Sequence, residues 1–196
     1  MHEPWRSLPW AIAFWIVYIL VFSLEARWMI RSRDADNTEV RECDTSCVIV
    51  GAMFIAVALA FWFADRSRTF YFGWQTRSWF FLGLALMLAG VALRQWAMSA
   101  LGPHFTGEVV IQAGHRLVET GLYGHIRHPA YSGAFLIWLG LGLALTNGVS
   151  LLILGIAAAL AYGLRIRAEE AALTVAFGER YRDYCRKTRR FVPGLF

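Results

Sequence analysis

The residues best suited to chemistry lie in one short segment, residues 121–133, which reads Gly-Leu-Tyr-Gly-His-Ile-Arg-His-Pro-Ala-Tyr-Ser-Gly. Arg127, His128 and Pro129 stand where a polar stretch meets a long apolar run. Proline suits the first turn of a helix, because its missing N–H has no partner to lose there. Free backbone N–H groups and the positive end of the helix dipole favour an anion at that point. The segment therefore predicts an anion-binding helix start or, as the alternative, an interfacial anchor made by Arg127 and His128.

A second set of candidate residues ends the last apolar run: Arg165, Glu169 and the adjacent Glu170. Positions i and i+4 share one face of a helix. A carboxylate at membrane depth is expensive unless it is paired or faces a cavity. One interpretation is an Arg165–Glu169 ion pair that only ends the helix. The other is a site in which Glu169 receives a cation and Arg165 an anion, which would suit a ligand with an amino-acid moiety.

The cysteines and the paired glycines point to no other chemistry. Cys43 and Cys47 lie four residues apart and Cys185 stands alone, without a Cys-x-x-Cys or Cys/His ligand set. We therefore expect no metal and no disulfide. Gly140-Leu141-Gly142 lies inside an apolar run, where small residues serve helix packing rather than nucleotide binding.

The elements that must position these residues are apolar helices. Of 196 residues, 58% are hydrophobic and 17% charged, with a mean hydropathy of +0.46, whereas soluble domains have roughly 45–50% and about 25%. The uncharged run 129–164 has 36 residues, and as one helix it would measure roughly 54 Å against a hydrocarbon core of about 30 Å. We expect it to fold back at Thr146-Asn147-Gly148. The expected spans are 7–24, 45–64, 78–94, 130–145 and 149–164.

The predicted fold class is all-α: a polytopic membrane protein with five transmembrane helices, of which the last two form a helical hairpin. The third span is short, and we expect it to continue past Arg94, whose side chain would snorkel to the interface. The chain forms a single integral membrane domain, 1–196. Its chemistry is expected in a loop at 95–128 and a tail at 165–196.

The distribution of charge orients the chain. Arg and Lys concentrate in cytoplasmic loops. With five spans, one side of the membrane receives 15 of the 19 basic residues and the other receives four. The N-terminus is therefore expected outside, with the C-terminus, the loop and the tail in the cytoplasm. This asymmetry accounts for the net charge of +5 without a nucleic-acid partner, and no basic groove interleaved with aromatic residues suggests one.

Both polar segments are expected to be ordered. In the loop, apolar residues alternate with glycines, which predicts short extended pieces and turns that pack against another part of the protein. In the tail, apolar and aromatic residues recur at steps of four, four and three: Leu173, Phe177, Tyr181 and Tyr184. This spacing predicts one amphipathic helix, which Pro193 and Gly194 are expected to end. The alternative is a helix that only lies on the anionic inner leaflet, which its basic side fits and the Glu169-Glu170 pair does not.

Taken in order, these motifs resemble those of the isoprenylcysteine carboxyl methyltransferases, integral membrane enzymes that use S-adenosylmethionine. The related phospholipid N-methyltransferases share much of the pattern. The resemblance runs from about His115 to Pro193 and rests on these pieces: His115-Arg116-Leu117-Val118, Gly-x-Tyr at 121–123, Arg-His-Pro-x-Tyr-x-Gly at 127–133, Arg165-x-x-x-Glu169-Glu170-x-x-Leu173, Phe177-Gly178-x-x-Tyr181-x-x-Tyr184 and Arg190-x-x-Pro193. The sequence departs from the family at Pro103-His104-Phe105-Thr106, where many members have a tryptophan followed by serine, so the acceptor could differ.

The resemblance implies that S-adenosylmethionine lies in a cytoplasm-facing pocket covered by the loop and the tail. The residues that match the family's cofactor-binding segments are His115, Arg116, Leu117, Val118, Tyr123, His128, Pro129, Ala130 and Tyr131. It further implies that Glu169 holds the amino-acid end of the cofactor and that Arg165 faces the substrate. Glu169 and Arg165 are therefore the candidate catalytic residues.

The reaction expected from this resemblance is methyl transfer to a lipid-like acceptor, the carboxylate of an isoprenylcysteine-like substrate. Such a carboxylate is ionised near pH 7 and needs no general base, so the enzyme mainly aligns the reactants and excludes water. An amine acceptor of a phospholipid would need a base, for which His104, His125 or Glu170 could serve. A small thiol is a third acceptor type, and a structural or transport protein without turnover is the alternative outside the enzymes.

Overall fold

The computed structural model describes residues 7–34, 43–66, 70–73, 76–102 and 117–191, the side chains of 28–34 and 43–47 excepted. This part of the chain contains helices and no β-strand. In chain order the helices are α1 (Trp10–Asp34), α2 (Cys43–Arg66), α3 (Thr76–Leu101), the 3-10 turn η4 (Gly121–Gly124), α4 (Pro129–Ala144), α5 (Gly148–Phe177) and α6 (Glu179–Lys187).

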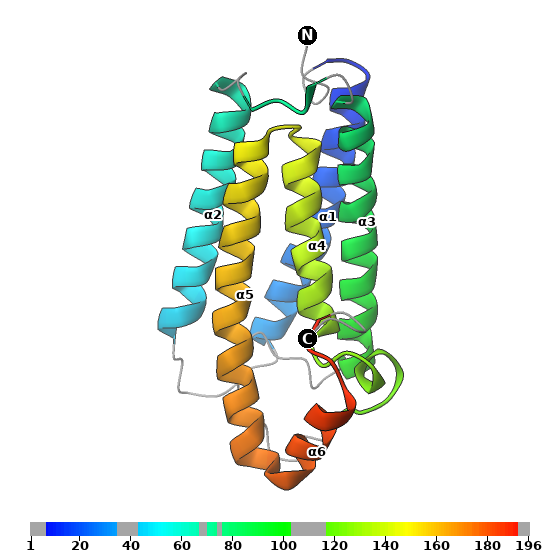
Figure 1. Cartoon of the computed structure of the whole chain (residues 1–196), viewed down its shortest axis with the longest axis vertical. Coiled ribbons are helices and arrows are strands. Elements are labelled where there is room, and N and C mark those ends of the chain that lie inside the picture. The colour runs from blue at the N-terminus through cyan, green and yellow to red at the C-terminus, as the bar shows by residue number, and fades with distance from the viewer. Residues whose placement is uncertain (1–6, 35–42, 67–69, 74–75, 103–116, 192–196) are drawn as a thin grey trace.

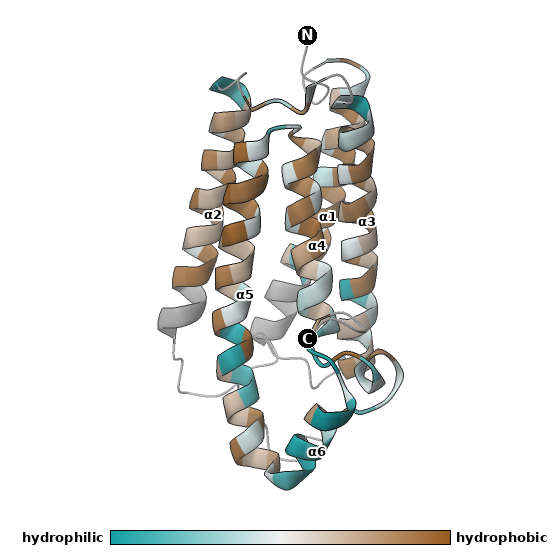
Figure 2. Ribbon diagram, viewed as in Figure 1, coloured by the Kyte–Doolittle hydropathy of each residue, from teal (hydrophilic) through white to brown (hydrophobic). Residues whose placement is uncertain are grey.

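The five long helices lie side by side in an elongated bundle (Figure 1). Their contacts place them in the order α2, α5, α4, α3 and α1, with the most extensive packing between α3 and α4. α5 continues beyond the ends of the other helices, and α6 lies beneath the bundle (Figure 1). Figure 2 shows that the bundle is mostly hydrophobic, whereas the lower part of α5 and α6 carry hydrophilic residues. The largest group of hydrophilic residues therefore lies at the end of the molecule that holds α6, with smaller groups at the other end of α2 and α3.

Apolar side chains cover the outside of the bundle, as a membrane environment requires. Ile16 of α1, Phe54 of α2, Leu88 of α3 and Leu160 of α5 are all exposed. In the described residues, four helical segments are long and apolar enough to cross a membrane: Trp10–Arg27, Val48–Arg66, Thr76–Leu101 and Gly148–Phe177. α4 is apolar but shorter, with 16 residues. The predicted class, an all-helical multi-pass membrane protein, is confirmed.

The predicted hairpin between the last two apolar helices is present. The side chain of Asn147 caps α5 by accepting hydrogen bonds from Val149 N at 3.0 Å and Ser150 N at 3.1 Å. Ser150 Oγ donates to Ala60 O of α2 at 2.6 Å, which ties the turn to a neighbouring helix. The turn is therefore fixed both by its own cap and by the bundle.

Glycines allow α3 and α4 to pack backbone against backbone. A Cβ added at Gly90 would lie 2.6 Å from Gly133 O, and one added at Gly133 would lie 2.6 Å from Gly90 O. The same reciprocal approach joins Gly83 and Gly140, again at 2.6 Å in both directions. We call these four residues the glycine seam. The packing role predicted for Gly140 is confirmed, because helices can approach this closely only where side chains are absent.

Several helices run further than the predicted spans. α1 ends at Asp34 rather than near 24, and α3 at Leu101 rather than near 94. α5 continues past the expected span end at 164 to Phe177, as expected from a helical tail that follows directly on the fifth span. The predicted limits follow the first charged residues, but Arg, Glu and Gln are good helix formers and continue a helix that apolar residues begin. The loop expected from residue 95 therefore begins with the last two turns of α3.

The tail does not form the single amphipathic helix that was predicted. Gly178 has φ 53° and separates α5 from α6. Glycine adopts this left-handed conformation without steric penalty and commonly ends a helix. Phe177 and Tyr181 therefore lie on different helices. α6 ends at Lys187, before Pro193 and Gly194, which lie outside the described residues.

Candidate active site

The segment singled out from the sequence opens α4 at the polar end of the bundle. His128 is the N-cap and Pro129 the first helical residue, as the proline predicts. N–H groups in the first turn of a helix have no acceptor within that helix, and here they belong to Ala130 and Tyr131. The predicted helix start, with its N–H groups and positive dipole end, is therefore present.

The carboxylate of Glu170 holds the residues in front of α4. Glu170 Oε1 accepts a hydrogen bond from Arg127 Nε at 3.3 Å and lies 3.2 Å from His128 Nε2. Arg190 donates from Nη2 to Oε2 at 2.6 Å and from Nε to Oε1 at 3.2 Å. This bonding raises the pKa of Arg190. Both oxygens of Glu170 are thus engaged, which argues against Glu170 as a free general base.

Arg127 points into the protein and not to a lipid interface. Its Nη1 donates to Cys185 O at 2.9 Å and to Thr188 O at 2.5 Å, while its Nε binds Glu170. The guanidinium therefore links α5, the end of α6 and the residues after it. The interpretation of Arg127 as an interfacial anchor is wrong, because its N–H groups bind protein acceptors.

The residues after α6 pair with the segment that precedes α4. Arg127 N donates to Arg189 O at 2.7 Å, His128 N donates to Arg190 O at 3.1 Å, and Arg189 N donates to His125 O at 3.0 Å. Ser132 Oγ adds a hydrogen bond to Phe191 O at 2.8 Å. The tail is consequently docked on the start of α4 by main-chain bonds.

Two tyrosines connect η4 to the helices around it. Tyr184 of α6 donates to Tyr123 O at 2.7 Å, and Tyr123 donates to Ala97 O of α3 at 3.3 Å. Burial raises the pKa of Tyr123, and the nearby Glu169 carboxylate raises it further. Burial likewise raises the pKa of Tyr184. Both phenols therefore keep their protons at neutral pH and act as hydrogen-bond donors.

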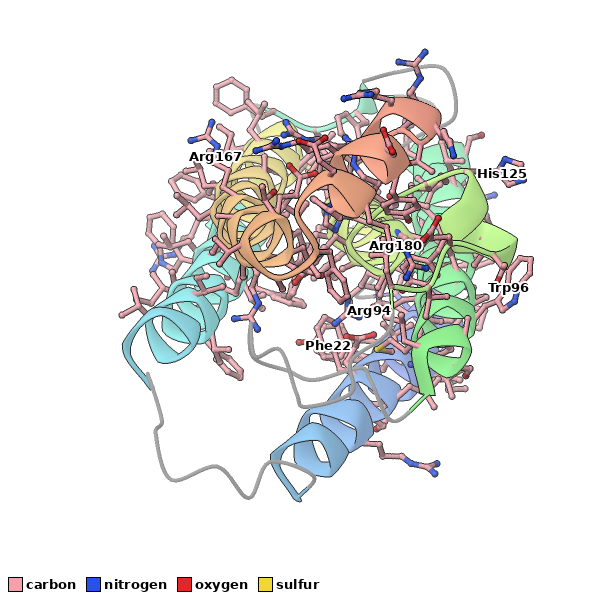
Figure 3. All side chains as sticks on the ribbon, turned by 90° about the horizontal axis from the view of Figure 1, so that it is seen from below. Phe22, Arg94, Trp96, His125, Arg167 and Arg180 are labelled. Carbon is pink, nitrogen blue, oxygen red and sulfur yellow. The ribbon has the colours of Figure 1, made fainter. Side chains whose placement is uncertain are left out.

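The predicted pair on α5 meets α4 at Tyr131. Arg165 and Glu169 both interact with the Tyr131 hydroxyl, and both side chains are half-buried. Arg167, two residues beyond Arg165, points away from the bundle (Figure 3). Thus the structure brings together the two candidate catalytic residues and one candidate cofactor-binding residue.

Other predicted residues surround this point or lie outside the described part of the chain. Val118 packs in a small core with Ala97, Tyr123 and Ala130, and Leu117 precedes it, half-buried. Three predicted residues lie outside the described residues: His104, His115 and Arg116. Within the described residues, no group of His, Cys, Asp and Glu side chains is arranged to hold a metal.

Arg94 does not snorkel as the sequence suggests. Its Nε donates to Glu25 Oε2 of α1 at 2.7 Å, and its Nη1 donates to Ala130 O of α4 at 2.9 Å. Viewed along the bundle from the polar end, Arg94 points inward beside Phe22, whereas Trp96 points outward (Figure 3). The spacing of residues along the sequence could not predict this contact, because Glu25 and Arg94 are 69 residues apart.

The fold and the site define a helical membrane protein with an arginine- and tyrosine-lined site at one end of its bundle. The model of the isoprenylcysteine carboxyl methyltransferase (ICMT) family matches residues 82–175, from the first turns of α3 to the last turn of α5. The chain is therefore similar to this family over that segment, which is just under half of its length.

Curated relatives from plants and other eukaryotes match parts of the chain. The protein-S-isoprenylcysteine O-methyltransferase B of Arabidopsis thaliana is 41% identical over 71 residues, which are 35% of this chain and 36% of that protein. The protein-S-isoprenylcysteine O-methyltransferase of Dictyostelium discoideum is 31% identical over 144 residues, 72% of this chain and 58% of that protein. The chain thus spans only about a third to three fifths of these relatives.

A solved structure shares the fold. The eukaryotic intramembrane Ras methyltransferase ICMT, solved without a monobody, has a TM-score of 0.62 to this chain at 20% sequence identity. The match covers 91% of this chain and 66% of that one. The likeness therefore extends to nearly the whole of this bundle.

Proposed function

We propose that this protein transfers a methyl group from S-adenosylmethionine to the carboxylate of an isoprenylcysteine-like acceptor. The observation that carries the proposal is the meeting of Arg165 and Glu169 at Tyr131, beside the start of α4. This meeting supports a site in which Arg165 can bind an anion and Glu169 a cation, next to the positive dipole end of α4. The family match across residues 82–175 and the names of the relatives supply the reaction class.

The residues at this point fit the amino-acid end of the cofactor. Glu169 receives its ammonium group, and the first-turn N–H groups of Ala130 and Tyr131 favour its carboxylate. His128 is fixed by Glu170 and Tyr123 by Ala97, which gives this side of the site a defined shape. Leu117, Val118 and Pro129 complete the described part of the binding segments. The predicted His115 and Arg116 belong to the same segments but lie outside the described residues.

The residues on the acceptor side need only bind and orient. The cofactor supplies an activated methyl group on sulfur when bound. An acceptor carboxylate is already ionised near neutral pH, so no proton has to be removed. Arg165 fixes the anionic group in line, and the tail docked on α4 keeps water from the reacting atoms.

Cofactor binding is the first test of this assignment. We expect S-adenosylhomocysteine, the product, to bind the detergent-purified protein saturably in a calorimetric titration. Glu169→Ala should weaken this binding about tenfold or more, since a charged hydrogen bond contributes about 1.5–3 kcal/mol. Glu179→Ala makes the same change at an exposed position ten residues further on, so its affinity should match the wild type. Equal loss in both variants would refute the role of Glu169.

Turnover distinguishes the acceptor. With a radiolabelled methyl donor and an S-prenylated cysteine derivative, we expect a product that releases labelled methanol in mild base, as a methyl ester does. Methylated amines and thioethers are stable to that treatment. Arg165→Ala should lower turnover by about 100-fold, in the range that positioning effects reach, while binding S-adenosylhomocysteine normally. Arg167→Ala is the matched control, because Arg167 points away from the bundle. Base-stable product would overturn the carboxylate assignment.

The topology that goes with this function has five spans, with α4 as the fourth. α4 has 16 residues and a length of about 24 Å, less than the hydrocarbon core of about 30 Å. α5 has 30 residues and about 45 Å, so its last turns leave the membrane. The charge asymmetry supports an N-terminus outside, with the site and the C-terminus in the cytoplasm. The chain then forms one integral membrane domain, and the lipid-like acceptor approaches from the bilayer.

A further inference from the structure

Arg94 is a charged residue that points into the bundle from α3, about two turns before the end of that helix at Leu101. Its side chain is 17% exposed, and that of its partner Glu25 is 22% exposed. Ion pairs withdrawn from water add little to stability, because desolvation offsets their attraction. Charged residues facing the interior of a membrane bundle usually mark a functional path. The Arg94–Glu25 pair therefore calls for a role beyond holding α1 to α3.

The guanidinium of Arg94 is only partly used. Arginine has five N–H donors, and Arg94 uses Nε for Glu25 and Nη1 for Ala130 O. In the described part of the chain, no hydrogen bond of its Nη2 is found. Glu25 Oε1 is buried and also lacks a partner among these residues. Arg127 is different, because its Nε and Nη1 bind a carboxylate and two carbonyl groups of the protein.

Arg94 lies beside the proposed site. It interacts electrostatically with Tyr131 and with Tyr162 of α5, and Tyr131 in turn interacts with Arg165. Tyr131 thus has one arginine from α3 and one from α5 as neighbours. The two arginines belong to different helices and both interact electrostatically with the same phenol.

Beyond Tyr162 the surroundings become aromatic. Trp138 Nε1 donates to the Tyr162 hydroxyl at 2.7 Å, and the Trp138 ring lies 5.5 Å from that of Phe22 in α1. Tyr18 follows, with its ring 4.4 Å from Phe22. The polar side chain of Arg94 is therefore followed, further into the bundle, by aromatic side chains. Such an arrangement suits a molecule with an acidic head group and an apolar chain.

We infer that Arg94 is a second recognition residue for the acceptor's carboxylate, with Glu25 fixing the guanidinium so that its open Nη edge faces the site. The inference rests on the proposed function and specifies how its acceptor is recognised. The planar fork of arginine matches a carboxylate in two parallel hydrogen bonds. The aromatic residues Phe22 and Trp138 then contact the apolar chain.

Direct binding of two ligands tests the inference: an N-acylated S-prenylcysteine and the same compound with a carboxamide in place of the carboxylate. Both are titrated into the purified protein in the presence of S-adenosylhomocysteine. The wild type should bind the acid about tenfold or more tightly than the amide, and Arg94→Ala should reduce that ratio to about threefold or less. Arg94→Lys keeps the positive charge but lacks the planar guanidinium, so its ratio of acid to amide affinity should lie between those of the wild type and Arg94→Ala.

Two further variants separate recognition from simple packing. Glu25→Gln keeps an oxygen acceptor for Arg94 but removes the competing negative charge, so the ratio of acid to amide affinity should stay equal or rise. Phe14→Ala loosens the contact of α1 with Phe80 of α3 at another place in the core. It should change the affinity for both ligands by the same factor and leave the ratio unchanged.

The possible results are distinct. An unchanged ratio in Arg94→Ala, with normal preference in the wild type, overturns the inference and leaves the proposed function standing. A wild type that binds S-adenosylhomocysteine but does not prefer the acid overturns both the inference and the carboxylate acceptor. Should Arg94→Ala fail to fold, Arg94→Lys and Glu25→Gln decide between the outcomes. An equal fall of the ratio in Arg94→Lys and Glu25→Gln shows a positioning effect only and overturns the recognition role.

Discussion

Glu170 is the residue on which the shape of the site depends most directly. Arg127, His128 and Arg190 all contact its carboxylate, which is 14% exposed. They lie 43, 42 and 20 residues away in the chain. Spacing along a helix predicted that Arg165 and Glu169 share a face, because that relation is local. It could not predict the partners of Glu170, because they depend on how the tail returns to the bundle.

Loss of the Glu170 charge should loosen the tail and the start of α4 together. We expect Glu170→Gln to lower the free energy of unfolding by about 2–3 kcal/mol, since hydrogen bonds to charged groups contribute about 1.5–3 kcal/mol each and this group remains partly hydrated. Thermal unfolding in detergent measures the effect, and binding of S-adenosylhomocysteine should weaken in parallel.

Glu179→Gln provides the comparison for Glu170→Gln. Glu179 is 70% exposed and pairs with Arg182 on the same helix α6, so its substitution should change stability by no more than about 0.5 kcal/mol. Similar unfolding temperatures for the two variants would show that the Glu170 cluster does not hold the site.

The boundaries of the helices were predictable where the length of an apolar run sets them. They were less predictable where a helix continues into polar sequence. The fold-back at Thr146-Asn147-Gly148 was found because 36 uncharged residues cannot form one span. The break at Gly178 was missed, because the periodicity of apolar residues continues across it. One left-handed glycine turns the chain regardless of that periodicity.

The glycine seam gives a prediction for the pair α3 and α4. Gly133→Ala should destabilise the protein by about 1–3 kcal/mol, the usual range for overpacking, because the added methyl group would meet the backbone of α3 at Gly90. Thermal unfolding in detergent checks this.

A glycine in open space serves as the control for the seam. Gly51 of α2 has nothing within 4 Å of an added Cβ, so Gly51→Ala should be neutral or stabilising by up to about 1 kcal/mol. A destabilisation as large in Gly51→Ala as in Gly133→Ala would mean that the close approach of the two backbones is not the cause.

At the scale of the whole molecule, composition and charge predicted more than the helix ends did. The mostly hydrophobic bundle and the hydrophilic end at α6 that Figure 2 shows both follow from the uneven distribution of charged residues along the chain. The contacts between side chains inside the bundle were harder to predict. The contact of Arg94 with Glu25 depends on α1 lying against α3, which no local pattern encodes.

Single cysteines test the orientation of the whole molecule. In a protein whose three native cysteines are replaced by serine, Arg186→Cys on the exposed side of α6 should react with a membrane-impermeant thiol reagent only after the membrane is opened. Leu8→Cys, at an exposed position before α1, should react in intact cells. The opposite pattern would invert the topology and place the site outside.

The glycine seam also limits how this protein can change over evolutionary time. Where two side chains meet in a core, enlargement of one can be compensated by reduction of the other. At the seam, the atoms that a new side chain would meet at closest range are backbone atoms of the facing helix, and every residue has those. No second substitution on the facing helix can therefore make room, so these four positions should remain intolerant in any sequence background while the lipid-facing residues around them vary freely.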